Sequence, residues 1–235
     1  MQNIRKFSVS ITVVCKLNHG IMKKIVFEKN FAECLEKNFS KYSKYFEFKT
    51  KVFRFRELEP LIFQVNKCLI LDLHSASITL TNHILERLLK LGLIYNEAGI
   101  GAIPVEKWNS IFMEPNRKYS DIPLGNSIEL CKKFELITTE EKGFLFDIIR
   151  ELMRNGFSHS DPSKILAGLP DETVAFHGNF SGQGEINQIS LNQKVIPFFQ
   201  AEHMESFAKE NSSFYFDYVF ELIDKIENRL IEKQK

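Results

Sequence analysis

The chain has 235 residues, of which 44% are hydrophobic and 26% are charged, a balance that suits one large domain with a sizeable core. This composition excludes extensive intrinsic disorder. Because the 31 basic and 30 acidic residues nearly cancel, the overall field will not draw the protein onto nucleic acid. Any such affinity requires a local basic patch.

The cysteines and the hydropathy pattern exclude further classes of protein. The four cysteines are widely spaced and form no Cys-x-x-Cys pair, so neither a zinc ribbon nor a disulfide framework is predicted. No stretch approaches the roughly 20 apolar residues that cross a bilayer. We therefore expect a cytoplasmic protein without metal, cofactor or membrane contact, and with reduced, mostly buried thiols.

A short apolar run over residues 7–15 follows two basic residues near the N-terminus. It resembles the start of a secretion signal, but Lys16 ends the run and no small-residue cleavage site follows. Two other interpretations are open. Residues 7–15 form a β-strand, or the natural start is Met22 and the preceding residues are an extension.

Helical spacing begins within residues 27–48, where aromatic and leucine residues recur three and four positions apart. We place this helix and the short strand in an N-terminal extension, residues 1–50. The alternation of polar and apolar residues at 51–56 predicts a short strand or an extended link. Residues 51–235 are expected to form the main domain.

The strongest helix prediction covers residues 76–94. Its apolar stripe comprises Leu80, Ile84, Leu88 and Leu91. Glu86 and Lys90 are spaced for a favourable ion pair on the surface of the same helix. This segment is therefore expected to be a central helix of the domain.

The prolines and glycines of residues 95–126 predict a long connection with one helical turn near Trp108. A helix over 127–136 follows. A capping box at 138–141 marks the start of the next helix, which is expected to reach Gly156.

The C-terminal part of the chain contains three further elements. The Asp161-Pro162 pair predicts a short helix over 162–167. Glycines among alternating residues favour a hairpin or loop over 170–195, and an amphipathic helix is expected over 212–233. The expected fold is an all-α helical bundle with an N-terminal extension and a small loop or hairpin insertion.

Candidate chemistry lies at Arg154 and His159, five positions apart. On a continuous α-helix these residues would lie about 140° apart, so they meet only where the helix ends or distorts. Gly156 costs about 1 kcal/mol in a helix interior, and the Asp161-Pro162 pair begins a new helix. We therefore expect the helix to end between the two residues, so that His159 turns back toward Arg154.

A polar face precedes these two residues. Asp147, Arg150, Glu151 and Arg154 are spaced by three, four and seven positions, so a helix places them together. This face suits a site, or simply ion pairs in solvent. In that structural alternative Arg154 pairs with Glu151 or Arg150 pairs with Asp147, and His159 caps the helix C-terminus.

The segment from Arg154 through Asn155 to His159 resembles the motif of the HEPN superfamily, in which an Arg and a polar residue precede a His at the end of a bundle helix. Glu151 matches the acidic or polar residue one turn earlier. The helix at 76–94 is similar to the first bundle helix of the family.

The resemblance covers about residues 70–235 and implies a metal-independent endoribonuclease of the toxin or phage-defence kind. It implies that His159 transfers a proton near neutral pH. It also implies that Arg154 binds the charged phosphorane. Asn155 then orients the phosphate or the imidazole, and Glu151 holds Arg154, with Arg150 and Asp147 as supporting residues.

The resemblance also implies partners. These are RNA, a second copy of the chain in a symmetric homodimer whose two motifs line one cleft, and an antitoxin or defence protein. Asp161 departs from the Tyr found in some family members, so regulation by modification of that Tyr is not implied. Two alternatives are a non-catalytic HEPN-like module that binds nucleotide or a partner protein, and a helical adaptor.

Overall fold

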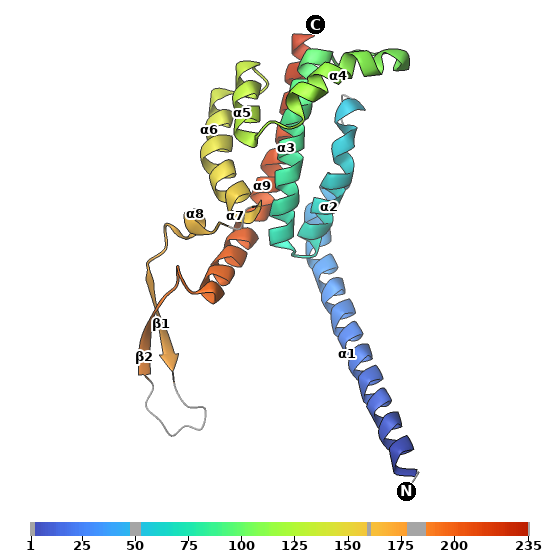
Figure 1. Ribbon diagram of the computed structural model, residues 1–235, viewed down its shortest axis with the longest axis vertical. Coiled ribbons are helices and arrows are strands. Elements are labelled where there is room, and N and C mark those ends of the chain that lie inside the picture. Colours follow the sequence, from blue (N-terminus) through green and yellow to red (C-terminus); the bar gives the residue numbers. More distant parts are fainter. Residues whose placement is uncertain (1–2, 48–52, 159–160, 178–186, 235) are drawn as a thin grey trace.

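The structure is a computed structural model that describes residues 3–47, 53–158, 161–177 and 187–234. Within these ranges every regular element is helical apart from one two-stranded hairpin (Figure 1). The prediction of an all-α bundle with a small hairpin insertion is therefore confirmed.

Two long helices form the centre of the bundle. α3 (His74–Ala98) packs along α9 (Pro197–Lys233), and α2 (Glu59–Ile70) also packs against α3. The fully buried side chains of the two long helices include Ile84, Leu85, Leu88 and Leu89 of α3 and Val219, Leu222 and Ile226 of α9. Each such side chain stabilises the fold by about 1.5–3 kcal/mol relative to an exposed position.

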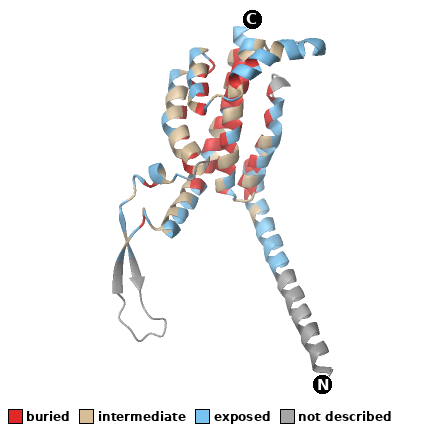
Figure 2. Cartoon of the chain, viewed as in Figure 1, coloured by how far each residue is buried: buried red, intermediate tan, exposed pale blue. Residues whose placement is uncertain are grey.

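Both central helices are longer than their apolar stripes predicted. α9 begins at Pro197 rather than near residue 212, because proline at the first helical position is already set in a helical φ. The first turns of α9 are largely exposed (Figure 2), and so they carry little apolar periodicity.

The predicted strand over residues 7–15 is wrong. This segment lies in α1 (Asn3–Tyr42), a 40-residue helix whose N-terminal part projects from the bundle (Figure 1). A helix satisfies its backbone hydrogen bonds within the segment, whereas a lone strand leaves both edges unpaired. The helix expected within residues 27–48 is confirmed as the C-terminal part of α1.

The end of α1 joins the core. Tyr42 is buried, and Tyr45 in the following 3₁₀ turn η1 (Ser43–Glu47) makes an edge contact with Phe216 of α9, with ring centroids 4.7 Å apart. The expected strand or extended link at 51–56 is, where described, a 3₁₀ helix, η2 (Phe53–Leu58).

The connection after α3 is more ordered than expected. A turn, η3 (Val105–Lys107), leads into α4 (Trp108–Tyr119), which contains Pro115 in its interior. An internal proline costs about 3 kcal/mol. Here Pro115 and Tyr119 are buried, and this packing offsets the cost.

The next two helices begin where their caps require. α5 (Leu124–Lys133) starts directly after Pro123, three residues earlier than predicted, and ends before Glu135, which has a φ of 54°. α6 (Thr139–Phe144) begins with the predicted capping box, in which Thr138 and Glu141 satisfy each other's backbone N–H groups.

The remaining elements confirm the predictions for this region. The short helix is α8 (Ser163–Leu166), but its N-cap is Pro162 and not Asp161 as predicted. The Asp161 carboxylate, one residue earlier, accepts from the Ser163 N–H at 3.0 Å. β1 (Glu172–His177) pairs with β2 (Asn187–Asn192) as an antiparallel hairpin. The residues that join the two strands lie outside the described part of the chain.

Candidate functional site

The helix that carries Arg154 is widened. After α6 the chain continues as η4 (Leu145–Arg154), a π-helix, and then as α7 (Asn155–Ser158). The Asn155 N–H donates to the carbonyl of Arg150, five residues earlier. Such π turns are rare and frequently occur at functional sites.

The widening changes which side chains share a face. On an ideal α-helix Phe146 and Asn155, nine positions apart, would lie on about opposite sides. In η4 each turn contains more residues, and both side chains line one pocket. The prediction of an ordinary helix up to Gly156 is therefore wrong in its geometry, and the helix also continues two residues further, to Ser158.

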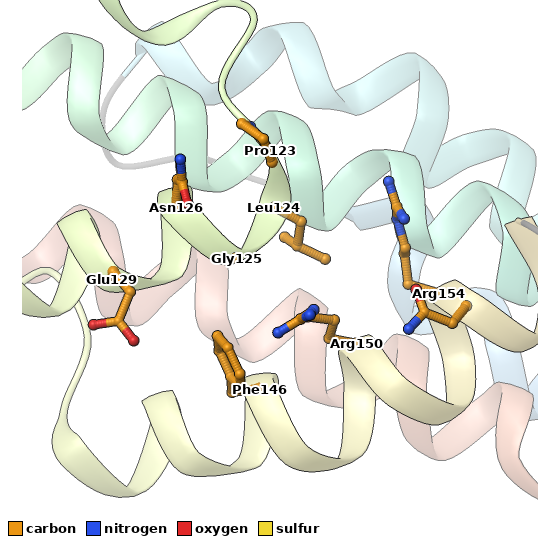
Figure 3. Close-up of a pocket in the computed structure, with 9 residues that line it drawn as sticks. Pro123, Leu124, Gly125, Asn126, Glu129, Phe146, Arg150 and Arg154 are labelled. Carbon is orange, nitrogen blue, oxygen red and sulfur yellow. The ribbon is translucent and has the colours of Figure 1, made fainter. Parts of the chain in front are cut away.

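The pocket has a volume of about 450 Å³ and lies between the N-terminus of α5 and the widened helix (Figure 3). Its wall from α5 and the preceding residue comprises Pro123, Leu124, Gly125, Asn126 and Glu129. Its wall from the widened helix and α7 comprises Phe146, Arg150, Arg154 and Asn155.

Arg150 crosses the pocket toward α5. Its guanidinium carbon lies 4.3 Å from the centroid of the Phe146 ring, a cation–π contact. A Cβ placed on Gly125 would lie 3.8 Å from Nη1 of Arg150, so this glycine brings the backbone of α5 close to the guanidinium. The carboxylate of the neighbouring Glu151, which does not line the pocket, lies 3.8 Å from Nε of Arg150.

Arg154 is directed to another side of the pocket (Figure 3). Its Nε donates to the carboxylate of Glu86 on α3 at 3.2 Å, and both side chains are less than one-third exposed. Glu86 was expected to pair with Lys90, whose ammonium instead donates to the carbonyl of Ser120. The pairing across the bundle therefore anchors Arg154.

The first turn of α5 adds a third source of positive potential. The N–H groups of the first residues of a helix have no partner within it, and Pro123 at the cap has no side-chain acceptor to offer them. The aligned peptide dipoles place partial positive charge at this end. Glu129 is the acidic residue of the wall, and it is paired with Lys142 at 2.8 Å.

A buried amide fixes the backbone beside Arg154. Asn82 of α3 donates to the carbonyl of Met153 at 3.2 Å and accepts from the hydroxyl of Tyr215 at 2.8 Å. Asn82 and Tyr215 are both buried. This contact ties the widened helix to α3 and α9 at once.

The helix does not break at Gly156. It continues to Ser158, and a Cβ on Gly156 would lie only 2.7 Å from Cδ1 of Ile165 in α8. The glycine thus permits a close approach of α8 rather than ending the helix. His159, the predicted acid–base residue, lies outside the described residues.

The structure brings together three of the six predicted site residues. Arg150, Arg154 and Asn155 line the pocket, whereas Asp147 and Glu151 are not among its lining residues. The sequence analysis did not predict that the residues of α5 form a wall of the site, or that Glu86 and Asn82 hold the widened helix in place. Only the glycine and asparagine that open α5 carried a signal, because such residues mark a helix start.

Comparison of the chain with models of known protein families, with curated proteins and with solved structures found no match. The resemblance to the HEPN superfamily therefore stays a prediction. Among the described helices, none has the length and hydrophobicity of a membrane span.

Proposed function

We propose that the protein is a metal-independent endoribonuclease of the HEPN kind and that the pocket between α5 and η4 binds the phosphate at the cleaved linkage. One observation supports this proposal above the others. Arg150, Arg154, Asn155 and the first turn of α5 converge on one pocket of about 450 Å³. Two guanidinium groups and a helix N-terminus are the groups that bind phosphate oxygens in proteins.

The proposed reaction needs no metal. The RNA 2′-oxygen forms a bond to the adjacent phosphorus and the bond from phosphorus to the 5′-oxygen breaks, which leaves a 2′,3′-cyclic phosphate and a 5′-hydroxyl. A base takes the proton of the 2′-hydroxyl and an acid protonates the leaving oxygen. His159 performs one of these transfers, since imidazole titrates near neutral pH.

The two arginines would stabilise the crowded phosphorane, in which negative charge builds up on the phosphate oxygens. The bond from Nε of Arg154 to Glu86 holds this guanidinium in the pocket wall. Asn155, beside Arg154 in the pocket wall, would donate its amide to a phosphate oxygen. As in the family it resembles, the protein would act as a cytoplasmic toxin or phage-defence enzyme with a partner antitoxin.

The test is RNA cleavage in excess EDTA by the full chain. We expect wild type to cleave and Arg154→Ala and His159→Ala to lose at least 100-fold in rate, the usual contribution of such groups. The matched control is Arg117→Ala, because Arg117 is 78% exposed on α4 and pairs locally with Glu114. Cleavage that is unchanged in His159→Ala would contradict the proposal.

A second function is favoured by a specific feature of the pocket. Its described wall contains two arginines and two asparagine amides, which donate hydrogen bonds to anions, and no histidine. A non-catalytic module that binds a nucleotide would have this composition. In that case RNA stays intact, while Arg150→Ala weakens binding of a nucleoside diphosphate measured by calorimetry.

A further inference from the structure

An unpartnered apolar surface lies on α1, away from the pocket. Phe27, Phe31, Leu35 and Phe39 follow one another at intervals of four residues, and all are 39–69% exposed. Phe46 and Phe63 continue the surface at its C-terminal end. The ring centroid of Phe46 lies 6.1 Å from that of Phe39 and 5.1 Å from that of Phe63. We call these six side chains the aromatic stripe.

The N-terminal end of the stripe lies on a part of α1 that is exposed on all sides, whereas the C-terminal end of α1 packs against α2. Every residue from 23 to 33 is exposed (Figure 2). Most helices in proteins owe their stability to packing of an apolar face rather than to intrinsic propensity. The β-branched and aromatic residues Ile25, Val26 and Phe27 lower that propensity further. Burial of its apolar face against a partner would therefore stabilise this part of α1.

We propose that this partner is a second copy of the chain, bound through the same stripe about a two-fold axis. The exposed area fits such an interface. With about 200 Å² for each aromatic side chain, the stripe exposes on the order of 500 Å² of side chain. Two copies together reach about 1,000 Å², the size at which specific interfaces begin, before any flanking atoms are counted.

The spacing of the stripe also suits two identical helices. Residues at intervals of four form the ridges that interdigitate in the commonest class of helix packing, with helices crossing at about −50°. A two-fold interface requires a surface that is complementary to itself. An uncharged ridge that packs against its own copy meets that requirement without facing like charges.

The charges beside the stripe argue against an anionic membrane or RNA as the occupant. Lys24 pairs with Glu28 at 3.5 Å, and Lys29 pairs with Glu33 at 3.6 Å. A helix that lies on anionic lipid carries lysine and arginine on its polar face. Alternating charges are instead typical of exposed helices in protein assemblies.

This dimer differs from the one that the family resemblance implies. The pocket is lined by residues 123–129 and 146–155, whereas α1 projects from the other side of the bundle (Figure 1). Pairing through the stripe joins two molecules by the projecting parts of their α1 helices. The two pockets of such a dimer do not form one shared cleft. The inference therefore stands whether or not the protein cleaves RNA.

The test is the mass of the full chain in solution, measured by light scattering after gel filtration across a range of concentrations. We expect twice the monomer mass of 27.4 kDa for wild type. Phe27→Glu/Phe31→Glu should be monomeric, because both side chains are exposed within the monomer and buried only between copies. The matched control, Phe198→Glu, changes an equally exposed phenylalanine of α9 and should stay dimeric.

A milder variant, Phe31→Ala, keeps the test valid if Phe27→Glu/Phe31→Glu does not fold. We expect Phe31→Ala to raise the dimer dissociation constant at least tenfold. A wild-type monomer at about 100 μM would overturn the proposal. A dimer that survives in both stripe variants would also overturn it. So would a monomer that binds anionic vesicles through the stripe, which would make lipid the occupant.

Discussion

Replacing Asn82 with alanine should loosen the helix that carries Arg154. The substitution removes the bond to the Met153 carbonyl and leaves the Tyr215 hydroxyl, a fully buried donor, without its acceptor. A lost hydrogen bond costs about 0.5–1.5 kcal/mol, and an unsatisfied buried group costs about 1–3 kcal/mol. We therefore expect the free energy of unfolding to fall by about 2–4 kcal/mol.

The assay is urea denaturation, supported by thermal melting. For a domain of this size each kcal/mol lowers Tm by about 2–4 °C, so a loss of roughly 5–15 °C is expected. Burial raises the pKa of Tyr215 well above its ordinary value, so its hydroxyl is a neutral donor across the accessible pH range.

The decisive comparison is a double-mutant cycle. Tyr215→Phe alone should destabilise, because it removes the hydroxyl that bonds the buried Asn82 oxygen, but in the Asn82→Ala background it should be neutral or stabilising. We expect a coupling of about 1–2 kcal/mol. Additive effects, or a loss below about 0.5 kcal/mol for Asn82→Ala, would refute the assignment of Asn82 as the anchor of this helix.

Two further predictions concern the ends of the same helix. Gly156→Ala should destabilise the protein, because its Cβ meets Cδ1 of Ile165 at 2.7 Å. Adding Ile165→Val, which removes that carbon, should recover the loss in thermal melting; a double variant no more stable than Gly156→Ala would contradict this close contact. At the other end, burial alone would raise the pKa of Glu141, but hydrogen bonds from Arg229 and the Thr138 N–H lower it below 4.5. The unfolded chain then binds the proton more readily, so this stabilisation is present above about pH 4.5 and is lost as pH falls. Urea denaturation should show a smaller acid-induced loss of unfolding free energy in Glu141→Gln than in wild type, and equal losses would count against the ion pair.

Elements defined by local chemistry were predictable from the sequence. The capping box at Thr138 and Glu141 and the turn in which Asp161 accepts from the Ser163 N–H each involve residues within three positions of one another, so a short stretch of sequence contains all the information. The apolar stripe of α3 was equally visible, because a helix with one buried face repeats its apolar residues every three or four positions.

Elements that depend on distant residues were not predictable. Nothing near Arg154 identifies Glu86, 68 positions earlier, as its partner. The widened turns of η4 leave no periodic signal in ten residues, yet they decide that Phe146 and Asn155 share a wall. The run at 7–15 alternates like a strand, but a strand also needs a neighbouring strand, and sequence alone does not supply that information.

The chemistry of cleavage gives the most direct test of the proposed function. Wild-type protein in excess EDTA would be given a short RNA that it cuts, and the same RNA with a single 2′-deoxynucleotide on the 5′ side of the cleaved linkage. We predict a 2′,3′-cyclic phosphate from the first and no cleavage at that linkage in the second, because the attacking 2′-hydroxyl is absent. Equal cleavage of both would show that the 2′-hydroxyl is not the nucleophile and would contradict the proposed mechanism.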